Sequence, residues 1–152
     1  MQDFLSIIFD DLHLTDAEYF FVSASGDWAF GVNLPNRSIF HAVLQGEAII
    51  EVGDERHHLF AGDLMIVPTG SQHRIYALAG TENTVVDISG EFGRPRETPI
   101  TLGDGPLSAY ILTAGCRFDV ELGQPLMSAL PAALSILGVQ KSTPEWLRIG
   151  IE

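Results

Sequence analysis

The 152-residue sequence contains only one cysteine and one lysine, and it lacks any long apolar run. A single cysteine, Cys116, excludes an internal disulfide framework and is typical of a reducing compartment, which favours a cytoplasmic location. No apolar run approaches the roughly 18 residues that a membrane-spanning helix needs, and the first residues lack the basic start of a signal peptide. The sequence therefore argues against a disulfide-rich secreted domain and against a membrane protein.

Basic residues are scarce as well. Eight lysines and arginines stand against 20 aspartates and glutamates, which gives a formal net charge of −12 at pH 7. A chain this acidic repels the phosphate backbone of nucleic acids. We therefore expect no direct DNA binding by these residues, and any action on DNA would need another part of the protein.

The region from Glu18 to Asp119 is rich in short β-forming runs separated by glycine, proline, asparagine and aspartate. Short runs at a spacing of about 8–12 residues are typical of a β-sandwich or a closed barrel. The predicted strands are Glu18–Ala24, Trp28–Val32, Ser38–Leu44, Ala48–Val52, Glu55–Phe60, Leu64–Val67, Arg74–Leu78, Glu82–Ile88 and Ile111–Phe118.

Three glycine-containing segments are expected to form turns between these strands. Ser25–Asp27 is predicted to join its two flanking strands as a hairpin, and Gly53–Asp54 is a stronger hairpin signal. Gln45–Glu47 is predicted to be a turn that separates two further strands.

Both ends of the chain carry helical patterns. Asp3–Leu12 has apolar residues at helical spacing and aspartates on the other face, so a short amphipathic helix is expected. Pro125–Glu152 is predicted to be a helical segment, whose last helix begins near Ser142 with a proline close to its first turn. Because that helix stays apolar to its end without a cap, we expect the segment to continue into a further domain.

The most informative stretch runs from Gly62 to His73. An apolar run is bounded by Gly62–Asp63 on one side and by Pro68 to Gly70 on the other, which predicts a buried strand between two turns. The order of Gly62, Pro68, Gly70 and His73 resembles the second signature motif of the cupin barrels, with all four fixed positions present. The resemblance implies an all-β cupin fold, a double-stranded β-helix or jelly-roll barrel, here with a short N-terminal helix and C-terminal helical elements.

A second resemblance covers nearly the whole chain. The order of several marks is similar to the cupin domain at the N-terminus of AraC-type transcription regulators. These marks are Trp28, Leu34–Pro35, Phe40–Val43, Gly46, the Gly62–His73 motif, Cys116–Asp119, Pro125–Pro131 and Trp146–Leu147. The resemblance implies a small-molecule sensing domain that forms a homodimer, with DNA bound by a C-terminal helix-turn-helix domain that is absent from this sequence.

His41 and His73 are the candidate metal ligands. His73 stands where metal-binding cupins have a ligand, and strand alternation puts His41 on the same face as Ile39 and Val43, so the two imidazoles are expected to converge. Two neutral imidazoles are good ligands for zinc, iron, nickel or copper, but a site normally needs three or four protein groups. The alternative is that both histidines are hydrogen-bonding residues of a pocket wall, and we favour this alternative.

The family resemblance supplies no further ligands. The two histidines and the glutamate of the first cupin motif fall at Val32, Leu34 and Ile39, none of which can bind a metal. The family often has a cysteine and a histidine at positions that are Thr113 and Gln124 here. We therefore expect no cofactor. Cys116 is interpreted as a buried structural thiol because no base lies near it in the sequence.

Five residues are candidates for a mixed apolar and polar ligand pocket: Trp28, Arg37, His41, His73 and Tyr76. No catalytic residues are predicted. The favoured interpretation is a domain that binds a small effector and is not an enzyme. The first alternative is a metal-dependent cupin enzyme, a dioxygenase or an isomerase, that uses His41 and His73. The second is a protein–protein interaction module that binds no ligand.

Overall fold

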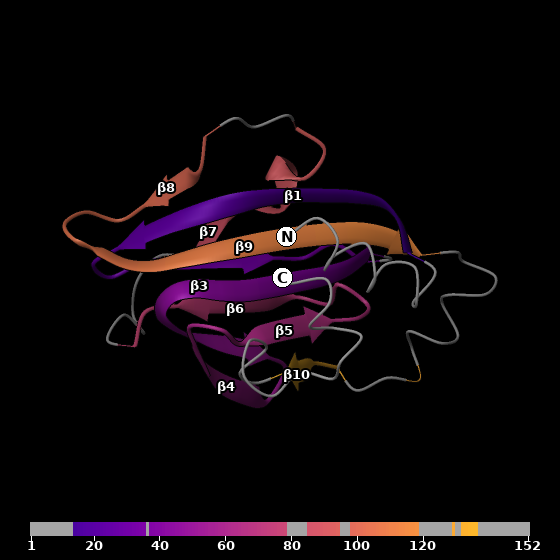
Figure 1. Ribbon diagram of the computed structural model, residues 1–152. Coiled ribbons are helices and arrows are strands. Elements are labelled where there is room, and N and C mark those ends of the chain that lie inside the picture. The colour runs from indigo at the N-terminus through magenta and orange to yellow at the C-terminus, as the bar shows by residue number, and fades with distance from the viewer. Residues whose placement is uncertain are drawn as a thin grey trace.

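The computed structural model of the protein describes residues 14–35, 37–78, 85–94, 98–118, 129 and 132–136. Over these residues the chain forms ten strands and one short 3-10 helix (Figure 1). The elements are β1 (Leu14–Ser25), β2 (Ala29–Val32), β3 (Arg37–Val52), β4 (Glu55–Phe60), β5 (Leu64–Val67), β6 (His73–Tyr76), β7 (Val86–Asp87), η1 (Ser89–Glu91), β8 (Ile100–Leu102), β9 (Leu107–Phe118) and β10 (Leu134–Ile136).

The strands form a folded sheet with two parts, and β3 belongs to both. The path of paired strands is β7-β2-β6-β3-β9-β1-β8. The first half of β3 pairs with β5 and β9, and its second half pairs with β4 and β6. We call the part with β1, β9 and β5 the β1–β9 sheet, and the part with β2, β6 and β4 the β2–β6 sheet. This arrangement, visible in Figure 1, confirms the predicted all-β jelly-roll fold.

Gly46 allows β3 to serve both sheets. The predicted turn at Gln45–Glu47 was wrong, because β3 runs without interruption for 16 residues. Gly46 has a φ of +79°. Just before it, between Val43 and Gln45, the register of β3 against β9 shifts. A Cβ at Gly46 would overlap the carbonyl oxygen of Ser108. Gly46 therefore bends the strand and permits close approach of β9, where the sequence suggested an interruption.

The first predicted hairpin was also wrong, whereas the second is confirmed. β1 pairs with β8 and β9, and β2 pairs with β6 and β7, so the strands that flank Ser25–Asp27 lie in different sheets. Gly53–Asp54 does connect two paired strands, β3 and β4. Only the second turn is of the two-residue kind that imposes antiparallel pairing on its neighbours.

The core lies between the two sheets. Alternate residues of β3, among them Ile39 and Val43, and alternate residues of β5, Met65 and Val67, face it and are buried. The predicted strand Leu64–Val67 is confirmed, and all four of its residues are buried. Burial of both faces of β5 explains why its sequence is continuously apolar and does not alternate.

Several predictions concern residues outside the described part of the chain. The helix Asp3–Leu12, residue Asp119 and most of the segment Pro125–Glu152 lie there. Within that segment the helical prediction was wrong for Leu134–Ile136, which form β10 and pair with β5. The β-rich region was predicted to end at Asp119, so β10 adds a strand from beyond that predicted end. No helix in the described ranges is long and apolar enough to cross a membrane.

Candidate functional site

The Gly62–His73 motif positions a loop and a strand by backbone contacts. The N–H of Gly62 donates to the carbonyl of Val43 at 2.9 Å, and Gly62 has a φ of +98°. The N–H of Leu34 donates to the carbonyl of Gly70 at 3.0 Å, and a Cβ at Gly70 would overlap the carbonyl oxygens of Leu34 and Arg37. Only glycine fits that second position. The motif thus holds the loop after β5 against the β2–β3 connection and places His73 at the start of β6.

His41 and His73 meet in the interior, as the alternation of β3 predicted. Their Nε2 atoms are 2.9 Å apart, and their ring centroids are 5.1 Å apart. Both side chains are almost completely buried, with 1% and 3% of their surface exposed. Because His41 comes from the first half of β3 and His73 from β6, this contact joins the two sheets across the core.

The partners of the two Nδ1 atoms determine which group donates in each hydrogen bond of a four-residue chain. His73 Nδ1 lies 2.7 Å from the carbonyl oxygen of Ser71, so it must carry the proton and donate. In the neutral ring His73 Nε2 is then an acceptor, so His41 Nε2–H donates to it. His41 Nδ1 in turn accepts from the Thr113 hydroxyl at 2.9 Å. We call these residues, Thr113, His41, His73 and Ser71, the histidine chain.

The electrostatics agree with this assignment. Burial lowers the pKa of His41 well below its ordinary value of 6.5, and the neighbouring His73 lowers it further. Burial also lowers the pKa of His73, against the opposing effect of its bond to the Ser71 carbonyl. Both rings are therefore neutral at pH 7, which is the state that the histidine chain requires.

The donor set does not fit a metal ion. All four ring nitrogens are used within the histidine chain, and a metal would have to displace the His41–His73 hydrogen bond. Thr113, the third residue in reach, offers a hydroxyl where zinc, iron or copper sites use imidazole, thiolate or carboxylate. Among the described residues, no group of three or more His, Cys, Asp or Glu side chains could hold a metal ion. Val32 and Ile39 are buried in the apolar core.

Trp28 lies in the same interior as the two histidines. Its indole N–H donates to the Ser108 hydroxyl at 3.0 Å, and its ring stacks on Phe30 with centroids 5.8 Å apart. Phe30 in turn makes an edge contact with His41, with centroids 6.0 Å apart. The rings therefore fill this part of the interior and pack against one another.

The other two predicted pocket residues lie elsewhere. Arg37, at the start of β3, forms a 3.0 Å ion pair with Glu18 of β1. Tyr76 alternates with His73 and Ile75 along β6 and so faces the outer side of the β2–β6 sheet, where its hydroxyl donates to Glu51. The five residues predicted to line one pocket are thus divided among three places.

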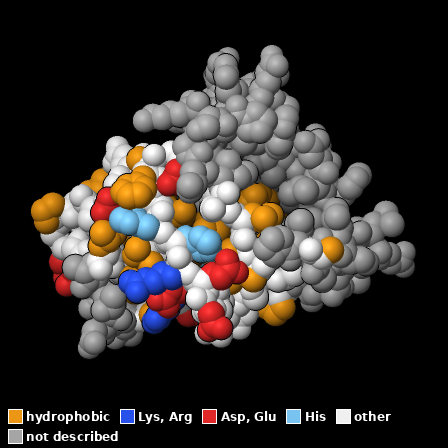
Figure 2. Space-filling model, turned by 90° about the horizontal axis from the view of Figure 1, so that it is seen from below, with side chains coloured by type: hydrophobic (Ala, Val, Ile, Leu, Met, Phe, Trp, Pro, Cys, Tyr) orange, Lys and Arg blue, Asp and Glu red, His pale blue; other side chains and the backbone are white. Residues whose placement is uncertain are grey.

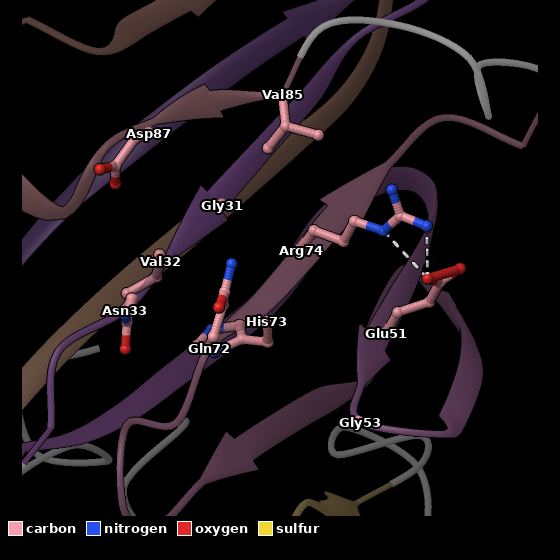
Figure 3. A pocket seen from close by; sticks show the side chains of 10 residues that line it. All are labelled: Gly31, Val32, Asn33, Glu51, Gly53, Gln72, His73, Arg74, Val85 and Asp87. Carbon is pink, nitrogen blue, oxygen red and sulfur yellow. Dashed lines mark hydrogen bonds and ion pairs between the residues drawn. The ribbon is translucent and has the colours of Figure 1, made fainter.

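A pocket of about 750 Å³ lies along β2 and β6 (Figure 3). Its lining includes Gly31 and Arg74 of the outer face together with Val32 and His73, which alternate with them along the two strands. Of the predicted residues only His73 lines it. The full lining is Gly31, Val32, Asn33, Glu51, Gly53, Gln72, His73, Arg74, Val85 and Asp87. The polar members of this lining were not predicted from the sequence. The one local signal for them was a glycine, Gly31, in the middle of a predicted strand.

Cys116 is buried, and burial raises the pKa of its thiol to about 12. Its sulfur lies 3.8 Å from the carbonyl oxygen of Ser38. A thiol in this state is a poor nucleophile at neutral pH, which supports the interpretation of Cys116 as a structural residue.

Comparison with known proteins now adds to this geometry. A family model described as Cupin matches residues 3–150. The chain belongs to the cupin family. This result confirms the resemblance that the Gly62–His73 motif indicated.

The similarity to AraC-type regulators is confirmed as well. The cupin domain is 34% identical over 156 residues to the HTH-type transcriptional regulator AlkR of Acinetobacter baylyi, an alignment that covers 99% of this chain and 50% of AlkR. The chain thus spans about half the length of this relative.

Solved structures with a partial similarity to this chain include the protein YhaK from Escherichia coli and ToxT from Vibrio cholerae. YhaK has a TM-score of 0.47 at 12% identity, covering 82% of this chain and 42% of YhaK. ToxT, solved with an unsaturated fatty acid bound, has a TM-score of 0.43 at 7% identity, covering 82% of this chain and 41% of ToxT.

Proposed function

We propose that this cupin domain senses a small molecule for an AraC-type transcription regulator. The observation that carries the proposal is the similarity to the regulator AlkR along 99% of the chain. The pocket of about 750 Å³ beside His73 is the site that we assign to the effector, because its size suits a small ligand.

DNA binding is assigned to a part of the protein outside these 152 residues. The formal net charge of −12 opposes contact with phosphate groups. Among the described residues on the face that Figure 2 presents, basic side chains form a small patch with acidic side chains beside them. The effector would act by favouring one of two arrangements of the attached DNA-binding parts, most simply within a homodimer. The single cysteine supports a cytoplasmic location.

The proposal is non-enzymatic, and the histidine chain supports that choice. An enzyme of the metal-dependent cupin type would need His41 and His73 to bind an ion, whereas here their ring nitrogens bond to one another and to Thr113 and Ser71. Elemental analysis of untagged protein, beside His41→Ala and His73→Ala variants, distinguishes the two functions. Near-stoichiometric metal that both variants lose would favour the enzyme.

Ligand screening by thermal unfolding tests the sensor function directly. An effector present at about 100 times its Kd is expected to stabilise the folded domain by about 2.7 kcal/mol. A Gly31→Val variant, which fills the pocket floor, should lose that shift. Gly90→Ala is the matched control, since a Cβ at Gly90 meets nothing within 4 Å and Gly90 does not line the pocket. Specific binding of DNA by the 152-residue chain alone would contradict the proposed division of roles.

A further inference from the structure

A row of directly opposed residues crosses the outer face of the β2–β6 sheet. Asp87 of β7 is opposite Gly31 of β2, and Gly31 is opposite Arg74 of β6. Arg74 is opposite Glu51 of β3, which is itself opposite Arg56 of β4. Opposed residues of neighbouring strands point to the same face. We call this series, acid, glycine, base, acid and base across five strands, the charged row.

Gly31 forms a gap in the charged row. A Cβ there would lie 3.0 Å from a methyl group of Val85 and 3.4 Å from the carbonyl oxygen of His73, so the Val85 side chain already covers part of the space over Gly31. Arg74 and Asp87 stand on the two sides of the gap, with backbones two strand spacings apart, or roughly 9–10 Å. The pocket opens over this gap, as Figure 3 shows.

Arg74, on one side of the gap, has N–H groups that its ion pair with Glu51 does not use. Its Nε and Nη2 atoms donate to one carboxylate oxygen of Glu51 at 2.9 and 2.7 Å. A guanidinium group has five N–H bonds, so three remain. Figure 3 shows the third nitrogen directed away from Glu51. Arg74 can therefore donate to a ligand oxygen as well, without losing its ion pair with Glu51.

Asp87, on the other side of the gap, has no ion-pair partner among the described residues. Asp87 accepts a hydrogen bond from the backbone N–H of Ser89 at 2.9 Å. The ion pairs of the described residues are Arg37–Glu18, His57–Glu55, His58–Glu47 and Arg74–Glu51, and none includes Asp87. A positively charged ligand group would balance this carboxylate.

These charges select among ligand classes. A simple anion is disfavoured, because Glu51 and Asp87 both line the pocket and the whole chain is acidic. A simple cation would meet Asp87 but leave the donors of Arg74 unused. A molecule with an amine at one end and a carboxylate at the other matches both sides of the gap.

We propose that the pocket binds a small zwitterionic molecule, with its amine at Asp87, its carboxylate at Arg74 and its apolar middle over Gly31 and against Val85. The proposal rests on the sensor function proposed above, because it names the ligand class of the same pocket.

Titration of the isotope-labelled chain with ε-aminocaproic acid, followed by amide NMR, tests this proposal. The probe should shift amides around Gly31 in a saturable way. Asp87→Asn and Arg74→Gln should each weaken binding about twofold to fivefold, the effect of losing one solvent-exposed charge pair. Arg56→Gln is the matched control, because Arg56 belongs to the charged row and lies over the Tyr76 ring but does not line the pocket. Its affinity should equal that of the wild type.

Two further probes, caproic acid and hexylamine, each lack one of the two charges and should bind more weakly by a similar factor. Three results would overturn the zwitterion proposal: no shift with ε-aminocaproic acid, unchanged affinity in Asp87→Asn and Arg74→Gln, or equal affinity for caproic acid. If another compound moves the same amides while ε-aminocaproic acid does not, the sensor function stands and only the ligand class is wrong. If no compound of a broad screen moves them, both proposals fail.

Discussion

Titratable side chains on the inner and outer faces of the β2–β6 sheet lie in opposite environments, buried on the inner face and solvated on the outer face. On the inner face, His73 is buried, neutral and bonded to His41 within the histidine chain. On the outer face, the next residue, Arg74, is exposed, charged and paired with Glu51. One step along a strand thus separates a desolvated neutral network from a solvated ionic one. The inner group is suited to holding the sheets together, and the outer group is suited to meeting a ligand.

Removing one inner histidine is expected to have the largest effect on stability. His41→Ala leaves His73 Nε2 and the Thr113 hydroxyl buried without a partner and opens a cavity, so we expect a loss of about 2–4 kcal/mol. Urea unfolding measures the change.

A double-mutant cycle sharpens this test. Replacing both histidines by leucine removes the buried polar atoms together, so the double variant should lose less stability than the sum of His41→Leu and His73→Leu. Strict additivity would mean that the two rings do not depend on each other, contrary to their 2.9 Å contact.

The two faces of the β2–β6 sheet are expected to lose their contributions to stability in different pH ranges. The pKa values of His41 and His73 are lowered by folding from an ordinary 6.5, so the unfolded chain binds protons at a pH where the folded chain does not. Their contribution to stability is complete above about pH 6.5 and declines as the pH falls, by at most about 1.4 kcal/mol per pH unit for each histidine. Unfolding free energies measured from pH 7 downwards report this decline.

The contribution of the outer face to folding stability should decrease only at lower pH. Hydrogen bonds from Tyr76 and then Arg74 lower the pKa of Glu51 from its ordinary 4.5, so its contribution is present above that pH and is lost below it. A Glu51→Gln variant should therefore follow the wild type between pH 7 and 5. A variant with leucine at both inner histidines should lose most of the slope there. A wild-type profile that is flat over this range would contradict the assigned burial of the histidines.

Thr113→Val is expected to have an intermediate effect. The substitution keeps the shape of the side chain and removes the hydroxyl that donates to His41 Nδ1 at 2.9 Å, leaving a buried acceptor unsatisfied. We expect a loss of about 1–2 kcal/mol, less than for His41→Ala. Ser108→Ala is a useful comparison, because Ser108 accepts from the Trp28 indole at a partly buried site. A loss for Thr113→Val as small as that of an exposed substitution would show that the hydroxyl does not complete the chain.

Glu51→Gln should have the smallest effect at neutral pH. Its partner Arg74 is about half exposed, so the ion pair is weakened by solvent, and we expect a loss below about 1 kcal/mol. Added salt should reduce the difference between the variant and the wild type, whereas the effect of His41→Ala should not change with salt. A loss as large as that of His41→Ala would remove the distinction between the two faces.

Local features of the fold followed from the sequence because they depend on neighbouring residues. The turns around Leu64–Val67 follow from Gly62, Pro68 and Gly70, whose backbone preferences act within a few positions. The placement of His41 on the core side of β3 follows from the twofold alternation of a strand. The net charge and the single cysteine are likewise properties of the chain alone.

Pairing across long separations had to come from the tertiary structure. The flanks of Ser25–Asp27 enter different sheets, and β3 continues through Gly46, because distant strands compete for the same backbone hydrogen bonds. His41 and Thr113 are 72 residues apart in the sequence. They meet because the register between β3 and β9 places them opposite each other.

The charged row arises in the same way. Its members come from five strands, and no local pattern announces that Asp87, Gly31 and Arg74 lie side by side. The sequence by itself determined the composition, the turns and the face of each strand, since these depend on covalent neighbours. Only the tertiary structure decided which side chains meet, because register and sheet order are set by the packing of the whole core.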